Sequence, residues 1–286
     1  MKIFFCGGPL KSGTTFLQRM LDSHPEISCQ PENIFNDLLA DFLDLRERYN
    51  RKLSNVAKTL GINPVLAKKN AFVDSFYSLI GEFFLNKPAS KKISGINDNY
   101  FILRNSKPVL KFFPKAKIIY IVRNPIDTAL STWDHFYRLY YETNNPGYLN
   151  WLVTKNKKID KEVFLYNNSK EWNRDINLIL DAKADSENIK IVRYEDLVIN
   201  KEINLIEILD FLGASSSKKI VQKLIDSSSL SMMKINSNNP NFYSKARLDF
   251  GAADLNQKVK RKIVASTIKN LEKLNYLNDY EEYLSR

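Results

Sequence analysis

The sequence predicts an α/β fold with a mostly parallel central sheet and helices on both of its faces. Short apolar runs that suit buried strands alternate along the chain with longer segments of helical periodicity. The run at residues 118–122 is β-branched and continuously apolar, which is typical of a central strand covered on both faces. The run at residues 3–6 leads through a glycine-bearing loop into an amphipathic segment. Because helical segments separate the strands, neighbouring strands are expected to run parallel.

Apolar runs and breaker residues place the individual elements. Pro25 ends the first helix, Gly61 ends the second and Gly213 ends a later one, because proline cannot continue a helix and glycine favours its C-terminal cap. Asn124 followed by Pro125 is a typical helix start. Four strands are expected at residues 3–6, 27–30, 118–122 and 189–192. Helices are expected from the first loop to about residue 24, and at 35–60, 65–85, 101–112, 125–141, 161–180, 203–212, 218–226 and 257–274.

The domain organisation follows from this order of elements. Two hundred and eighty-six residues are enough to bury one large core. We expect a single domain over residues 1–286, with a helical insertion at about 36–92 that carries no chemical motif. Residues 91–99 are polar and are expected to form a loop or the end of a strand.

Composition excludes some classes of function. The formal charge of +11 predicts attraction to anions without identifying which one. Cys6 and Cys29 are the only cysteines, so no disulfide framework is implied, and two histidines cannot form a histidine-rich metal site. No metal is expected. The apolar run before Gly7 is too short for a signal peptide, and no stretch approaches the roughly 20 apolar residues of a membrane span. We therefore expect a soluble, cytoplasmic protein.

The loop between the first strand and the first helix predicts a phosphate-binding site. Its unpaired N–H groups and the positive end of the helix converge at one point. Residues 8–15 fit the pattern G-x-x-x-x-G-x-T, but the nucleoside-triphosphate loop has lysine directly after the second glycine. Thr14 occupies that position here, and Lys11 lies before Gly13 instead.

The segment Lys-Ser-Gly-Thr-Thr-Phe-Leu at residues 11–17 resembles the 5′-phosphosulfate loop of sulfotransferases that use 3′-phosphoadenosine 5′-phosphosulfate (PAPS). The resemblance implies sulfuryl transfer from PAPS to a hydroxyl or amine, with adenosine 3′,5′-bisphosphate (PAP) as the product. Lys11 would stabilise the leaving phosphate, where negative charge grows as the S–O bond breaks. The cofactor would be held by the loop and the start of the helix, at Ser12, Gly13, Thr14, Thr15 and Phe16.

Three further segments carry the resemblance. Arg-Asn-Pro-x-Asp with a serine eight residues after the arginine is similar to the segment that binds the 3′-phosphate, which assigns Arg123 and Ser131 to that group. Without the first motif, Arg123 would more simply form an ion pair with Asp127. Tyr194 stands where family members place an aromatic ring beside the adenine. Near the C-terminus only Arg247 and Gly251 match the family's closing segment.

The general base is open among several residues. Cytosolic members of the family use a histidine in a Lys-Thr-His segment, but residues 95–99 read Gly-Ile-Asn-Asp-Asn. Carbohydrate and tyrosylprotein branches use a glutamate soon after the first helix, a position that Glu32 matches. Glu32 can accept a proton if partial burial raises its pKa. Asp98 is the second candidate and His135 the third, with packing on a helix as the simpler role for His135.

The glycine loop, Glu32, Arg123 and Tyr194 all follow predicted strands. Ligands of parallel sheets bind at the carboxyl ends of the strands, so we expect these four segments to meet at one edge. The acceptor is expected to be a small molecule, a carbohydrate or a lipid, in a pocket shaped by the helical insertion and by residues 137–151.

Two other functions fit parts of the sequence. One is a P-loop kinase or NTPase, which the displaced lysine and the lack of a strand ending in a magnesium-binding Asp disfavour. The other is a non-catalytic module that binds PAP or RNA, although no basic stripe with stacking aromatics is evident and nucleic acid is not expected as a partner. The resemblance also leaves a Golgi location open, because Golgi members of the family carry a membrane anchor.

Overall fold

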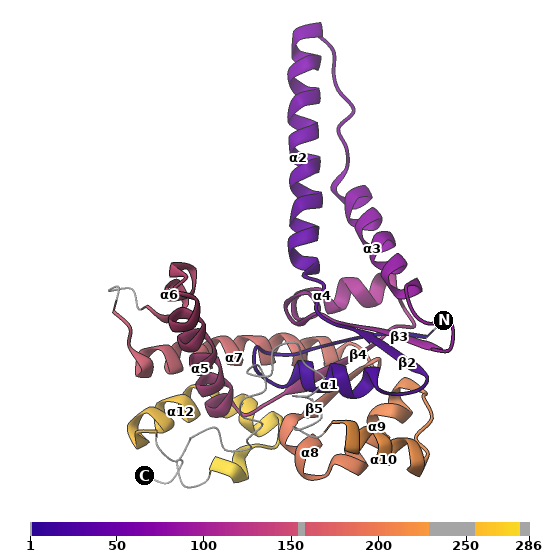
Figure 1. The fold of residues 1–286 in the computed structure, drawn as a ribbon. Coiled ribbons are helices and arrows are strands. Elements are labelled where there is room, and N and C mark those ends of the chain that lie inside the picture. Colours follow the sequence, from indigo (N-terminus) through magenta and orange to yellow (C-terminus); the bar gives the residue numbers. More distant parts are fainter. Residues whose placement is uncertain (1, 154–157, 229–254, 281–286) are drawn as a thin grey trace.

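The computed structural model describes residues 2–153, 158–228 and 255–280 (Figure 1). The strands are β1 (Lys2–Gly7), β2 (Ile27–Gln30), β3 (Ile93–Asn97), β4 (Lys117–Val122) and β5 (Ile189–Arg193). The helices up to β5 are α1 (Thr14–Asp22), α2 (Phe35–Leu60), α3 (Lys69–Leu85), α4 (Asn99–Phe112), α5 (Pro125–Thr143), α6 (Pro146–Leu152) and α7 (Lys161–Ala184). The helices after β5 are α8 (Tyr194–Ile199), α9 (Lys201–Leu212), α10 (Lys218–Ser227), α12 (Gln257–Lys273) and the 3₁₀ helix η3 (Leu277–Tyr280).

The predicted fold class is confirmed by a five-stranded sheet of order β2-β3-β1-β4-β5 in which every pair is parallel. Strand β4 lies between β1 and β5 in the interior of the sheet and is fully buried from Ile118 to Val122. Its alternate side chains enter two cores, with Tyr120 in one and Ile121 in the other. Helices therefore cover both faces of the sheet.

Each core has its own set of helices. Helices α3, α4, α5, α7 and α12 pack with Phe5 and Tyr120 on one face, and α1, α8, α9 and α10 pack with Phe4 and Ile121 on the other. In Figure 1 the strands lie between α3 and α4 above and α8, α9 and α10 below.

Strand β3 was not predicted as a full strand, and its composition explains why. It reads Ile-Ser-Gly-Ile-Asn, which has little of the β-branched character of β4. Gly95 is required because a Cβ there would lie 2.0 Å from the ring of Phe4 on the neighbouring strand. The packing of β1 thus selects a residue that weakens the strand signal of β3.

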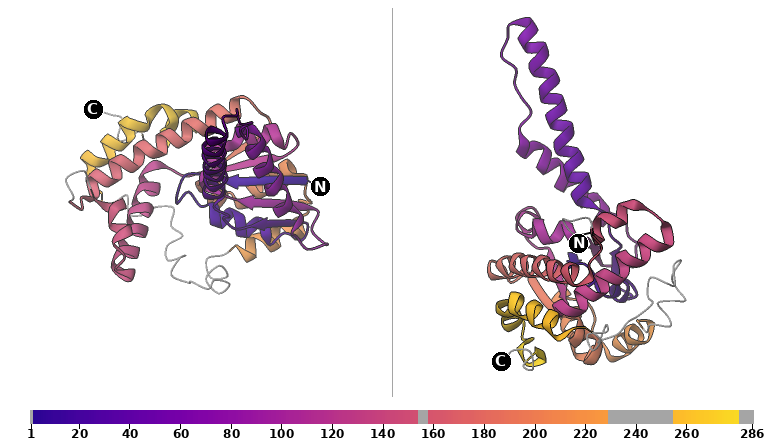
Figure 2. Two further views of the ribbon diagram at one scale, coloured as in Figure 1. Left: turned by 90° about the horizontal axis from the view of Figure 1, so that it is seen from above. Right: turned by 90° about the vertical axis from the view of Figure 1, so that its left-hand side faces the viewer.

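Helices α2 and α3 form an arm that extends away from the sheet (Figures 1 and 2). The prediction for α2 is confirmed at residues 35–60. Helix α3 begins at Lys69 and not at Val65, since residues 62–68 form no regular secondary structure and Ala67 is hydrogen-bonded to Asn50 on α2. Helix α6 was not predicted either, although Asn145 caps it and Pro146 occupies its first turn.

Candidate active site

Four predicted segments follow β1, β2, β4 and β5, and the parallel topology places their starting points at the same edge of the sheet. The glycine loop follows β1, Glu32 follows β2, Arg123 follows β4 and Tyr194 follows Arg193 at the end of β5. The expectation that these segments meet at one edge agrees with this topology.

The loop after β1 has the geometry of an anion-binding turn. A Cβ at Gly8 would lie 2.1 Å from the carbonyl oxygen of Ile121, so only glycine allows the loop to pass this close to β4. Gly13 precedes α1 with φ of 100°, in the left-handed region. No side chain caps α1 and its first turn carries no acidic residue, which leaves its first amides and its positive dipole end for an anion.

Hydroxyl groups around the loop differ in what they can offer. The Ser12 hydroxyl is fully buried and donates to the carbonyl oxygen of Pro9 at 2.6 Å, so it closes the loop. Thr14 and Ser131 are buried, whereas Thr15 is half-buried. Phe16 lies edge-to-face with Tyr194 at 6.0 Å between ring centroids.

Lys11 lies in a cationic environment. Burial, followed by the charges of Arg138 and Arg123, lowers the pKa of Lys11 to about 8 against the opposing charge of Asp134. Lys11 and Arg123 are 112 positions apart in the sequence, yet each lies within electrostatic range of the other. Cations held this close favour a polyanionic ligand between them.

Arg123 is buried and lies between an acidic partner and an aromatic ring. Its Nη2 is 3.1 Å from Oδ2 of Asp127, the ion pair that the sequence allowed. Its guanidinium carbon lies 4.8 Å from the centroid of the Tyr194 ring. A Cβ at Gly13 would lie 2.5 Å from Cδ2 of that ring, so Tyr194 packs directly on the glycine loop. Tyr194 therefore links the loop to Arg123.

Glu195, next to Tyr194, fixes the turn that carries Arg123. Its Oε1 accepts hydrogen bonds from the backbone N–H and the side-chain amide of Asn124, both at 2.9 Å. Its Oε2 accepts one from the Tyr276 hydroxyl at 2.6 Å. Sequence reasoning gave Glu195 no role, and only its place beside Tyr194 could have indicated one.

Glu32 and Asp98 lie close together beside this edge, in different environments. Glu32 is exposed as a residue, but its carboxyl is partly desolvated by neighbouring protein atoms. This desolvation, followed by the negative charge of Asp98, raises the pKa of the carboxyl, and a hydrogen bond from the Asn99 N–H opposes the rise. Asp98 is buried, and its two oxygens accept backbone N–H groups of Phe35 at 2.8 Å and Phe101 at 3.2 Å. Asp98 therefore connects the first turns of α2 and α4.

His135 and Arg138 bring α5 into the same site. Burial, followed by the charges of Lys11 and Arg138, lowers the pKa of His135 to about 4, so its ring is neutral at pH 7. Sequence reasoning ranked His135 third as a base and missed Arg138. The spacing from Ser131 through His135 to Arg138 is that of one helix face, and this signal could have identified both.

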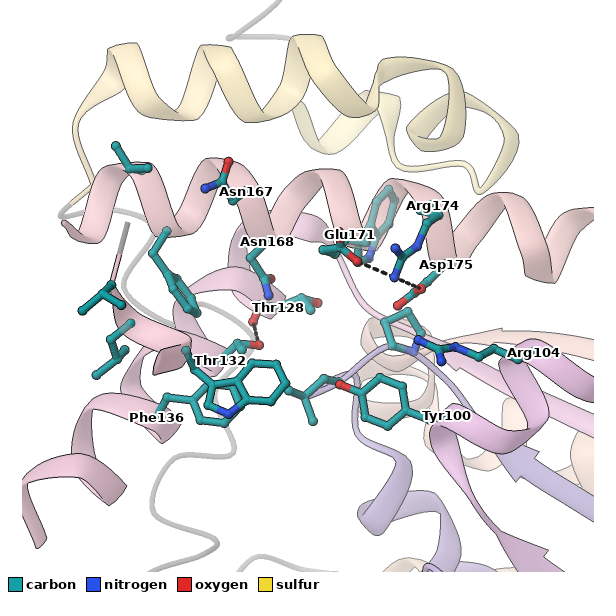
Figure 3. A pocket seen from close by; sticks show the side chains of 18 residues that line it. Tyr100, Arg104, Thr128, Thr132, Phe136, Asn167, Asn168, Glu171, Arg174 and Asp175 are labelled. Atoms are coloured by element: carbon teal, nitrogen blue, oxygen red, sulfur yellow. Dashed lines mark hydrogen bonds and ion pairs between the residues drawn. The ribbon is translucent and has the colours of Figure 1, made fainter. Parts of the chain in front are cut away.

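A cavity of about 360 Å³ lies against the loop at Pro9 and Leu10. Figure 3 shows Tyr100 and Arg104 on one side of it and Phe136 on the other. One wall is aromatic and aliphatic, since the ring of Phe136 stacks on that of Trp151 at 5.2 Å. The volume is at the lower end of the range for small-molecule sites, about 300–1,000 Å³.

The opposite end of the cavity is charged. Arg174 forms ion pairs with Glu171 and with Asp175, the latter at 4.0 Å (Figure 3). Burial, helped by the charge of Glu171 and opposed by that of Arg174, raises the pKa of Asp175 to about 6. The cavity thus has an apolar end and an end that can change its charge near neutral pH.

The arm does not line this cavity. Within the described ranges, no residue of the 36–92 segment is among those that line it, whereas Trp151 from the expected 137–151 segment is. The arm leaves the site at Phe35 and extends away from it (Figure 1).

Three further expectations concern Arg247, a metal site and a membrane span. Arg247 lies outside the described residues. In the described part of the chain, no three His, Cys, Asp or Glu side chains are grouped so that they could hold a metal ion. A search of the same part finds no helix with the length and apolar character needed to cross a membrane.

The curated proteins that the sequence resembles include several named sulfotransferases. Mouse sulfotransferase 6B1 is 32% identical over 129 residues, which is 44% of this chain and 39% of that protein. Protein-tyrosine sulfotransferase A of Caenorhabditis elegans is 24% identical over 225 residues, which is 76% of this chain and 51% of that protein. The chain thus spans about two fifths to one half of the length of these curated relatives.

Solved structures share the fold. Mouse sulfotransferase SULT7A1 complexed with PAP matches with a TM-score of 0.58 and 20% identity over 99% of this chain and 88% of that chain. The sulfotransferase domain of the Synechococcus PCC 7002 olefin synthase matches with a TM-score of 0.56 and 19% identity over 96% and 94%. The model of the sulfotransferase family matches residues 3–217, about three quarters of the sequence. The chain therefore belongs to the sulfotransferase family.

Proposed function

We propose that this protein transfers a sulfuryl group from PAPS to a hydroxyl or amine of an acceptor. The observation that carries the proposal is the junction of the glycine loop, Lys11, Arg123 and Tyr194 at one edge of the sheet. Family membership supports it, as does the match to a sulfotransferase structure complexed with PAP.

The residues present fit a nucleotide with phosphates at two positions. The uncapped start of α1 suits one phosphate, and the forked guanidinium of Arg123, which precedes α5, suits the other together with Ser131 in the second turn of α5. The Tyr194 ring between Gly13 and Arg123 offers a face or edge to the adenine. PAPS supplies the sulfuryl group and a phosphate leaving group.

The roles of Lys11 and Glu32 follow from their charges. The Lys11 ammonium stabilises negative charge on the leaving phosphate oxygen. Glu32 accepts the acceptor's proton, and its raised pKa brings it closer to neutral pH, where a base works best. Asp98 is less suited to this role because backbone N–H groups engage both of its oxygens.

The cavity beside Pro9 and Leu10 is the proposed acceptor site. Its stacked Phe136 and Trp151 favour an acceptor with an aryl or alkyl body over a bare sugar. A phenol fits this description, and it is the group that the relatives named protein-tyrosine sulfotransferases would act on. Small phenols, tyrosine peptides, hydroxylated lipids and sugars form the panel for testing it.

The experiment that tests the function has two parts. PAP should raise the melting temperature of the protein, and ATP with magnesium should not, which separates this function from a kinase or NTPase. Transfer of labelled sulfate from PAPS to any acceptor in the panel separates it from a non-catalytic PAP- or RNA-binding module. Stabilisation by ATP with magnesium and not by PAP would overturn the proposal.

We also propose a cytoplasmic location. Cys6 and Cys29 are the only cysteines of the sequence and both are buried free thiols, so the fold depends on no disulfide and suits a reducing compartment. Fractionation of cells that express the full-length protein tests this location.

A further inference from the structure

The outer part of the arm has a defined shape of its own. We call residues 45–69 the distal arm; it contains the outer part of α2 and the chain that returns to α3. Asn50 donates to and accepts from the backbone of Ala67, at 3.0 and 2.8 Å. The Ile62 N–H donates to the carbonyl oxygen of Ala57 at 3.0 Å. These bonds hold the returning chain against α2.

An apolar stripe along the distal arm is exposed. Leu45, Tyr49, Val56 and Leu60 follow each other at intervals of four, seven and four residues, which places them on one face of α2. Each of these side chains is more than half exposed, and Val65 beyond the helix is 91% exposed. In Figure 1 and in the right-hand view of Figure 2 this part of the chain extends well beyond the rest of the molecule.

The same segment is strongly basic. It contains seven Lys or Arg residues and one Glu. Arg46 pairs with Glu47 and Arg48 pairs with Asp44. The remaining five, for which the described part of the chain provides no ion pair, are Arg51, Lys52, Lys58, Lys68 and Lys69.

These two properties together select the class of partner. A second copy of the chain would bring the same positive charge against the stripe, and like charges oppose that contact. Nucleic acid would match the charge but would leave the aliphatic side chains of Val56, Leu60 and Val65 without a function. Exposed aliphatic side chains surrounded by Lys and Arg match the interface of an anionic lipid bilayer.

We propose that the distal arm docks on an anionic membrane surface, with its apolar stripe in the interface and its cations at the lipid phosphates and carboxylates. This proposal is independent of sulfuryl transfer, because no residue of the distal arm lines the cavity or belongs to the site described above. Docking needs no membrane-spanning helix.

The test is sedimentation of the full chain with vesicles. Vesicles of phosphatidylcholine alone are compared with vesicles of equal parts phosphatidylcholine and phosphatidylserine, at low and high salt. We expect binding to the mixed vesicles only, weakened by salt because the attraction is screened. Replacing two cations in Lys52→Gln with Lys58→Gln should weaken binding about thirtyfold, at roughly 1 kcal/mol for each charge.

Matched variants on the body serve as controls. Leu60→Asp with Val65→Asp should abolish vesicle binding, whereas Ile203→Asp on α9, where the side chain is similarly exposed, should not. Lys218→Gln with Lys219→Gln on α10 controls for the loss of charge. Circular dichroism checks the fold of each variant, and the two charge-neutralising variants keep the test valid if the aspartate variants unfold.

Three results would overturn the proposal. The first is equal binding to both kinds of vesicle or to neither. The second is binding that the arm variants leave unchanged. The third is a dimer, detected by light scattering, that Leu60→Asp with Val65→Asp dissociates without any vesicle binding by the original chain; the stripe would then be covered by a second copy.

Discussion

Lys11 combines a left-handed backbone with a crowded cationic setting. Its φ is 65°, a conformation that residues other than glycine rarely adopt and that persists when the surrounding structure enforces it. The same position brings its ammonium near Arg138 and Arg123, which lower its pKa. The residue is therefore held where cations repel it, and a bound polyanion would relieve that repulsion.

Replacing Lys11 tests its role in charge stabilisation. Lys11→Ala should lower the rate of sulfuryl transfer about 100- to 1,000-fold, because a donor aimed at developing charge is lost. The melting temperature without ligand should not fall, since the variant removes a repelled cation. Transfer at the original rate by a folded Lys11→Ala protein would contradict the assignment.

The pH dependence of kcat/KM tests both proposed groups in the free enzyme. The rate should fall as pH rises through about 8, where Lys11 loses its proton, and should fall on the acid side as Glu32 becomes protonated. Lys11→Arg keeps its charge at all these pH values, so the alkaline fall in rate should move to higher pH. An alkaline limb that stays in place in this variant would assign the limb to another group.

The choice of base is tested by separating activity from stability. Glu32→Gln should lower transfer about 100- to 10,000-fold with little effect on unfolding. Asp98→Ala should instead lower the free energy of unfolding by about 2 kcal/mol, because two helix starts lose their acceptor. If His135→Gln removes transfer and Glu32→Gln does not, His135 is the base.

At the scale of elements, the turn between β4 and α5 depends on a carboxylate from α8. Glu195→Ala removes three hydrogen bonds to Asn124 and Tyr276, each of them to a charged acceptor. We expect a loss of about 3 kcal/mol in the free energy of unfolding and weaker binding of PAP. Asp196→Ala, on the same helix but with its side chain partly exposed, is the control and should change neither. Chemical denaturation and calorimetric titration with PAP provide the measurements.

Much at this scale could be predicted from the sequence, and the exceptions have local causes. The glycine loop, the β4 run and the Asn124–Pro125 start are strong short-range signals, and they place Lys11 and Arg123 correctly at the sheet edge. Strand β3 was missed because contact with Phe4 requires glycine at position 95, which only tertiary structure reveals. The Glu195 bonds join segments distant in sequence, so no local pattern indicates them. The single-domain organisation stays a prediction.

At the scale of the whole molecule, the cavity and the proposed nucleotide site are separate surfaces that meet at the glycine loop. Trp151→Ala should raise the KM for an apolar acceptor about tenfold or more, because the stacked wall with Phe136 is lost. The rise in melting temperature caused by PAP should not change. Tyr141→Ala, which removes an exposed aromatic side chain of α5 outside the cavity, is the control. A change in PAP stabilisation without a change in acceptor KM would place the acceptor elsewhere.

The connection between α2 and the proposed active site has a mechanical consequence. Helix α2 has 26 residues and is about 39 Å long. It begins at Phe35, three residues after Glu32, and the Phe35 N–H donates a hydrogen bond to the Asp98 carboxylate. A rod fixed at its base works as a lever, so holding the far end restricts how the base can rotate. Anchoring the distal arm would therefore set the direction in which Glu32 and the neighbouring cavity face, and an acceptor tethered to the same surface would approach from a constant side.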